Sequence, residues 1–66
     1  MLTIETAKAY VANYFEKADI DIVAPAMDAV ATTFDGVPMV EVRFDLDGRK
    51  ECFSVWVEGG KLYGEW

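Results

Sequence analysis

The segment RFDLDGRKECF, residues 43–53, comes closest to a chemical site in this chain, because two aspartates stand beside a glycine. This arrangement occurs both in calcium-binding loops and in tight turns. An EF-hand loop has its glycine at position 6 and a bidentate glutamate at position 12. Counted from Asp45, Gly48 falls at position 4 and Trp56 at position 12, so the calcium spacing is not met. Asp47-Gly48 instead predicts a type I′ hairpin turn, and we expect no metal site.

Side chains suited to catalysis are scarce. The chain has no histidine, the usual general base near neutral pH. Cys52 and Ser54 are the nucleophile candidates, but the sequence places no base to activate either of them. Cys52 is the only cysteine, so it forms no internal disulfide and, without histidine, no structural zinc site. Paired carboxylates would need a deep cleft, which so small a domain does not offer. We therefore expect neither an enzyme nor a cofactor.

The length and composition predict a single folded domain, residues 1–66. A hydrophobic content of 53% and nine aromatic residues supply a core to a chain near the lower size limit for one. No apolar run approaches the roughly 20 residues that span a bilayer. The start, MLTIETAKAY, lacks the basic region and apolar stretch of a secretory signal. We expect a soluble cytoplasmic protein.

The first third of the chain predicts one amphipathic helix. Apolar residues recur at helical spacing from about Ile4 to Ala18, and Thr3 is placed to cap the first turn. The helix is expected to stop near Asp19.

The C-terminal half predicts antiparallel hairpins. Apolar and polar residues alternate from Val40 to Leu46, as in a strand with one buried face. A two-residue Asp47-Gly48 turn sets Val42 opposite Phe53 and puts the apolar residues of both strands on one face. Gly59-Gly60 predicts a second such turn, after which Trp56 and Tyr63 stand side by side on the outer face.

Residues 19–36 allow two interpretations. Pro25 could open a short helix that Gly36 ends, with Met27 and Phe34 on one side. Alternatively, Val30, Thr32 and Phe34 alternate as a fourth strand that reaches Val40 through a longer loop. We favour the strand. The expected fold class is α+β, with the N-terminal helix on one face of a three- or four-stranded antiparallel meander.

Charge is the most unusual global property. Twelve acidic and six basic residues give a net charge of −6, which opposes direct nucleic-acid binding and association with anionic membranes. Residues 16–35 hold five acids and one base, and four of the other five bases lie in and around the predicted sheet beside acidic partners. An uncompensated acidic edge suits a partner with a groove of lysine and arginine. The sequence therefore favours a protein-binding function.

Two resemblances bear on that function. The order of TIETAKAYVANYF and PMVEVRFDLDGRKECFSVWVEGGKLYG resembles PepSY-type modules, small domains with inhibitory or binding roles. This resemblance implies an interaction module that binds through the open face of the sheet, with Trp56 and Tyr63 as its anchors.

The small, acidic, histidine-free chain is also similar in kind to phage-borne anti-CRISPR proteins, several of which mimic DNA. That similarity implies a stoichiometric inhibitor, in the cytoplasm of a bacterial host cell, that blocks target-DNA binding by a type I CRISPR surveillance complex. Its acids would replace phosphates in a basic DNA-binding groove of an effector subunit. The expected partner-binding residues are Glu16, Asp19, Asp21, Asp28, Asp35, Glu41 and Asp45. We expect a monomer, with self-association through the edge strands or Trp66 left open.

Overall fold

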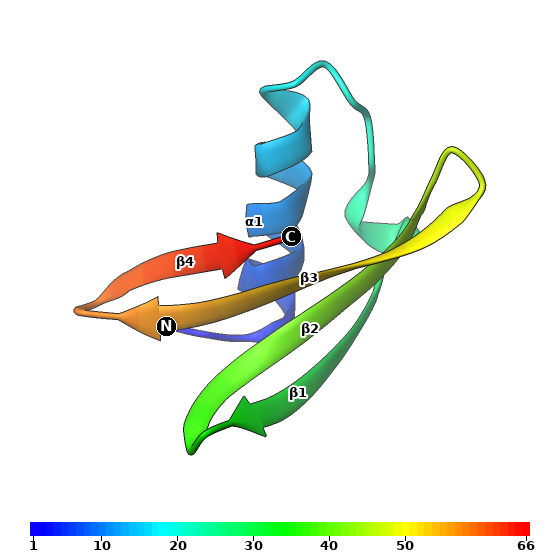
Figure 1. Ribbon diagram of the computed structural model, residues 1–66. Helices are drawn as coiled ribbons and strands as arrows, with labels where there is room; N and C mark the ends of the chain where they lie inside the picture. Colours follow the sequence, from blue (N-terminus) through cyan, green and yellow to red (C-terminus); the bar gives the residue numbers. More distant parts are fainter.

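A computed structural model describes all 66 residues and shows one helix packed against a four-stranded antiparallel sheet (Figure 1). The elements in chain order are α1 (Ile4–Glu16), the short 3-10 helix η1 (Ala24–Ala26), β1 (Asp28–Phe34), β2 (Val37–Leu46), β3 (Arg49–Glu58) and β4 (Lys61–Glu65). The strands lie side by side in the order β1-β2-β3-β4. The predicted α+β meander is confirmed, with four strands. No helix here has the length and apolar character needed to cross a membrane.

Helix α1 begins and ends through local hydrogen bonds. Thr3 caps its start as predicted: the Thr6 N–H donates to the Thr3 hydroxyl at 3.0 Å, and the Thr3 N–H donates to the Thr6 hydroxyl at 2.9 Å. The helix ends at Glu16, two residues before the predicted end. There the Ile20 N–H donates to the Phe15 carbonyl at 2.9 Å while Asp19 takes a left-handed φ of 60°, as in a Schellman motif. This ending turns the chain away from the helix axis.

Three two-residue turns build the sheet. Asp35-Gly36, Asp47-Gly48 and Gly59-Gly60 all have positive φ, as type I′ turns require. The Asp47-Gly48 segment is thus the predicted turn, with Val42 opposite Phe53 as expected. The longer loop predicted after β1 is wrong, because Phe34 pairs directly with Val37 across the Asp35-Gly36 turn.

The region between α1 and β2 is extended, as favoured from the sequence, and the alternative of a longer helix is not observed. Pro25 lies in the middle of a helix of only three residues, η1. The chain then enters β1, in which the β-branched residues Val30, Thr32 and Thr33 suit an extended backbone. Pairing with β2 decides the conformation of the alanine-rich part of this segment.

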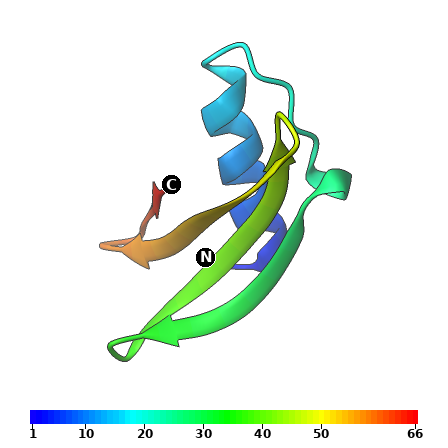
Figure 2. The same cartoon turned by 45° about the vertical axis from the view of Figure 1, so that its right-hand side comes forward.

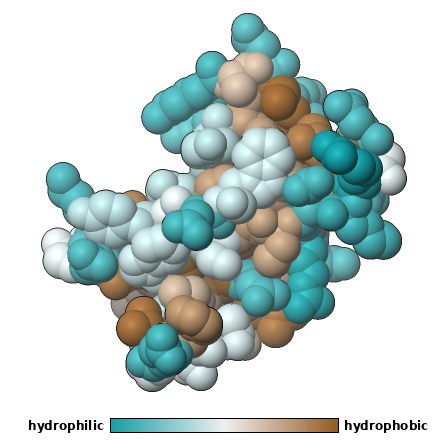
Figure 3. All heavy atoms as spheres, viewed as in Figure 1, coloured by the Kyte–Doolittle hydropathy of each residue, from teal (hydrophilic) through white to brown (hydrophobic).

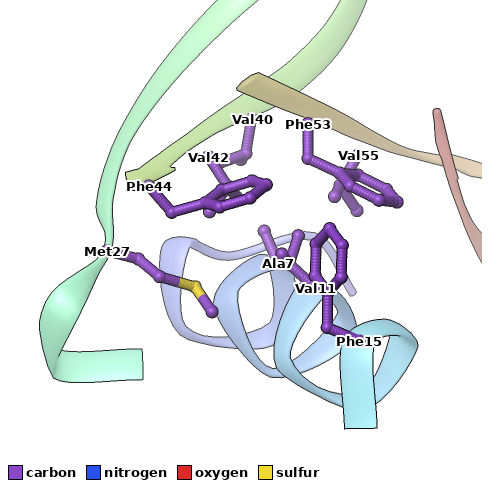
Figure 4. Packing of buried hydrophobic residues seen from close by; sticks show 9 residues of the cluster. All are labelled: Ala7, Val11, Phe15, Met27, Val40, Val42, Phe44, Phe53 and Val55. Atoms are coloured by element: carbon purple, nitrogen blue, oxygen red, sulfur yellow. The ribbon is translucent and has the colours of Figure 1, made fainter. Parts of the chain in front are cut away.

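The core lies between α1 and the inner face of the sheet (Figure 4). It is formed by one stripe of the helix, residues from β2 and β3, and Met27 from the end of η1, namely Ala7, Val11, Phe15, Met27, Val40, Val42, Phe44, Phe53 and Val55. The Phe15 ring lies edge-on to Phe44, with ring centroids 5.1 Å apart. Trp66 follows the end of the β3–β4 ladder, and its ring lies edge-on to Phe15 with ring centroids 5.0 Å apart.

The β1–β2 hairpin reaches beyond this core. Pairing of β2 with β3 ends at Val40 and Val55, whereas β2 continues to Val37 in contact with β1 alone. We call the part of this hairpin beyond the β2–β3 ladder, residues 32–39, the hairpin arm. The turn of the arm extends beyond the N-terminal end of α1 (Figures 1 and 2). Pro38 is tolerated here because its missing N–H would point toward β3, where the ladder has already ended.

Candidate binding surfaces

The outer face of the sheet has no second layer of structure against it. α1 covers the inner face only, so alternate residues of all four strands point to solvent (Figure 2). At the predicted position, the rings of Trp56 and Tyr63 stack with centroids 6.4 Å apart and an interplanar angle of 23°. This spacing lies within the range of interacting aromatic pairs, so the two rings form one continuous aromatic surface.

Apolar side chains of the hairpin arm and β1 extend this aromatic pair. The register places Phe34 beside Val37 and Thr32 beside Met39 on the same face. Phe34 is 64% exposed, the largest exposure of any aromatic residue in the chain. We call the combined surface the outer apolar patch; its members are Val30, Phe34, Val37, Met39, Trp56 and Tyr63. Figure 3 shows hydrophobic surface at the lower left, over the end of the hairpin arm.

A groove crosses the outer apolar patch. It has a volume of about 350 Å³ and is lined by Thr32, Thr33, Phe34, Met39, Glu41, Ser54, Trp56 and Glu65. Three of the eight lining residues are apolar and five carry hydroxyl or carboxylate groups. Apolar side chains next to polar groups can both bury surface of a bound molecule and fix its orientation. Sequence reasoning found the Trp56 side of this groove and missed the Phe34 side. The alternation of Val30, Thr32 and Phe34 was the available sequence signal. It assigns Phe34 to the outer face only once β1 is paired with β2.

The other half of the outer face is charged, and its charges are paired. Arg43 donates a hydrogen bond to Glu41 at 3.0 Å, and Lys50 lies 3.7 Å from Asp45. The hydrogen bond and charge of Glu41 raise the pKa of Arg43 above its usual value. Asp28 stands opposite Arg43 in the register. Figure 3 shows the resulting hydrophilic surface at the right, around the β2–β3 turn.

The seven predicted acids therefore fall into three groups. Glu16, Asp19 and Asp21 lie together around a shallow hollow at the C-terminal end of α1, and we call them the helix-end acids. Asp28, Glu41 and Asp45 share the outer face with Arg43 and Lys50. Asp35 sits in the β1–β2 turn, at the opposite end of the molecule from the end of α1 (Figure 1). They do not form one continuous strip.

The nucleophile candidates lie in the charged and groove regions of the outer face. Partial burial raises the pKa of the Cys52 thiol, and Glu41 raises it further. Both effects reduce the thiolate fraction at neutral pH, which lowers the reactivity of the sulfur. Ser54 lines the groove beside Glu41 and Glu65. No three histidine, cysteine or acidic side chains converge in a way that could hold a metal ion.

Comparison with known proteins gives no family for this chain. No protein-family model, no curated protein and no solved structure matches it.

Proposed function

We propose that this protein is a stoichiometric protein-binding module, and that the outer apolar patch and its groove form the binding surface. The single observation that carries the proposal is the contrast between the two faces of one sheet. The inner face is buried under α1, whereas the outer face exposes Phe34 at 64%, Val30 at 46% and Tyr63 at 42%. Apolar surface gathered in this way on a small acidic domain marks an interaction site.

The composition of the patch suits a protein partner. Tryptophan and tyrosine are the residues that most often dominate binding energy at interfaces, and here they are stacked before any partner arrives. A preformed aromatic pair lowers the side-chain entropy lost on binding. The two carboxylates of the groove, Glu41 and Glu65, place acceptors beside the apolar walls. These features support binding rather than catalysis. We further propose that the protein acts in the cytoplasm.

Affinity capture from the native host tests this assignment. The wild-type chain and two patch variants, Phe34→Ser and Trp56→Ala, are used as bait, with Val23→Ser as the control. Val23 is a 53% exposed apolar residue in the loop before η1, outside the patch. We expect a partner that the wild type and Val23→Ser capture and that neither patch variant captures. Capture of the same partner by every variant would show that another surface binds it.

The helix-end acids support a second candidate function, the acidic inhibitor expected from the sequence. Glu16, Asp19 and Asp21 are all exposed and make no ion pair within the chain, in contrast to Glu41 and Asp45. Three free carboxylates beside one another can enter a basic groove that normally holds DNA phosphates. The target of this candidate is a basic DNA-binding groove such as that of a type I CRISPR effector subunit.

Competition with DNA tests the second candidate. Purified type I surveillance complex is mixed with target duplex and increasing amounts of the protein, and DNA binding is followed by gel shift. The combined variant Glu16→Gln, Asp19→Asn, Asp21→Asn should lose inhibition. Its control, Glu5→Gln, Asp47→Asn, Glu58→Gln, changes the net charge equally at other exposed sites and should retain inhibition. Equal loss in both variants would point to net charge alone, and no inhibition by the wild type would remove this candidate.

A further inference from the structure

The two edges of the sheet differ in how they are protected. Edge strands commonly carry lysine, proline or a bulge that discourages pairing with another chain. β4 is only five residues long, carries Lys61 and Glu65, and is followed by Trp66, which contacts the helix residue Phe15. β1 has seven residues and pairs with β2 without a bulge. Between Ala29 and Phe34 it has no charge and no proline, so the edge formed by β1 is open.

The register shows which backbone groups β1 offers. A two-residue turn makes Phe34 and Val37 a hydrogen-bonded pair, and such pairs then alternate along the ladder. Thr32 and Val30 thus direct their N–H and C=O groups toward β2. The same groups of Ala29, Ala31 and Thr33 point away from the sheet. Three consecutive backbone sites on this edge have no partner strand within the chain.

These three sites are symmetric about Ala31, which is the midpoint of Asp28–Phe34. When two copies of β1 approach in antiparallel orientation, Ala31 can face Ala31 of the second copy, and Ala29 can face Thr33. Each of these pairs exchanges two hydrogen bonds, so every unpaired site on the edge is used. Val30 then faces Thr32 of the second copy on the outer face. No charged residue opposes another across the seven paired positions.

We propose that the protein forms a symmetric dimer by antiparallel pairing of its β1 edges about Ala31, giving one eight-stranded sheet. The occupant of the edge is a second copy because the three positions that offer backbone groups are spaced symmetrically about Ala31, and two copies of this edge bring no charged residues opposite each other. The dimer joins the outer faces of both copies, with Val30 and Thr32 at the seam. It does not depend on the outer apolar patch as a binding surface, so either inference can fail without the other.

The acids set the salt dependence of this dimer. Asp35 of one copy comes near Asp28 of the other at each end of the seam, and each chain carries a net charge of −6. Screening of this repulsion should make dimerisation stronger as salt rises. Binding through the helix-end acids to a basic partner has the opposite dependence, so salt separates the two events.

Sedimentation velocity over a range of protein concentrations tests the dimer. Ala31→Pro removes an N–H that makes no hydrogen bond in the β1–β2 ladder. In the dimer this N–H of each copy donates one hydrogen bond, so the substitution removes two. We expect this variant to weaken the dimer by roughly 10-fold or more while its circular dichroism and melting temperature stay near those of the wild type. Ala31→Thr keeps the N–H and should dimerise. A wild-type chain that stays monomeric at millimolar concentration, or an Ala31→Pro chain that dimerises fully, overturns the proposal.

Disulfide trapping tests the register. In a Cys52→Ser background, single Ala29→Cys, Ala31→Cys and Thr33→Cys chains are oxidised and run on a non-reducing gel. Facing Cα atoms of a hydrogen-bonded pair lie about 5.5 Å apart, within the range that a disulfide spans. Only Ala31→Cys should give a covalent dimer, because the other two positions face each other and not themselves. Cross-linking at Ala29→Cys or Thr33→Cys alone, or loss of the dimer in Phe34→Ser but not in Ala31→Pro, would refute this interface.

Discussion

The two outer hairpins of the sheet, β1–β2 and β3–β4, are built by the same local rule and end in different environments. Both close through a two-residue turn with positive φ, and both pair without a bulge. β3–β4 lies against α1, and its Gly64 lets the backbone approach the rings of Phe53 and Tyr10. The hairpin arm of β1–β2 has no such cover, and Phe34 and Val37 remain exposed there.

This difference separates stability from binding. A two-stranded hairpin alone is at best marginally stable in water, so cover by α1 makes β3–β4 part of the cooperative core. The hairpin arm contributes few buried groups, and its apolar side chains are free to contact a partner. Substitutions in the two hairpins should therefore affect different properties of the protein.

The matched pair Phe53→Ala and Phe34→Ala gives the largest expected contrast. Phe53 is 1% exposed in the core, whereas Phe34 is 64% exposed on the hairpin arm. Loss of a buried phenylalanine costs about 3–5 kcal/mol, comparable to the whole stability of a domain this small. The exposed change should alter the free energy of unfolding by about 0.5 kcal/mol or less. Urea denaturation followed by circular dichroism measures both, and equal destabilisation would show that the hairpin arm belongs to the core.

Gly64→Ala should have the second largest effect. A Cβ added at Gly64 would lie 2.4 Å from Phe53 Cε1 and 2.5 Å from Tyr10 Cε1, and both rings are packed between β3, β4 and α1. Overpacking of this kind costs about 1–3 kcal/mol. The melting temperature should fall without a change in dimerisation. Tyr10→Ala combined with Gly64→Ala tests the cause: removal of the Tyr10 ring makes space, so Gly64→Ala should cost less in that background than alone.

Local sequence rules were sufficient for the parts of the fold that depend on neighbouring residues. Thr3 predicted the start of the helix, and Asp47-Gly48 predicted a turn whose register the alternating apolar residues confirmed. The tight Asp35-Gly36 turn was missed although it has the same dipeptide. The alanines before it favour a helix, and only pairing with β2 makes this segment a strand.

The candidate surfaces were less predictable because they combine residues from distant elements. Trp56 and Tyr63 were found because one turn determines their positions. Phe34 joins them across the sheet, which requires β1 to be placed first. The acids were counted correctly in sequence, but pairing with Arg43 and the separate position of Asp35 depend on tertiary structure.

Substitutions in the β3–β4 turn should have the smallest effect on stability. They also test the difference between the two hairpins most specifically. Gly59 has a φ of 60°, close to the values of 51° and 52° that Asp35 and Asp47 adopt at the first position of their own turns, and it has open space around its Cα. Gly59→Asn suits this conformation and restricts the unfolded chain. We expect it to raise the free energy of unfolding by about 0.4–1 kcal/mol.

Gly60→Ala provides the control, because Gly60 has equal space but a φ of 79°, at a position that is glycine in all three turns. Alanine is strained there, so this variant should be destabilised. Asp35→Gly, which loosens the hairpin arm, should leave the urea midpoint nearly unchanged and speed amide hydrogen exchange within β1 alone. If Asp35→Gly instead lowers the global midpoint as much as Gly60→Ala does, the two hairpins unfold together and the division between a stabilising and a binding hairpin is wrong.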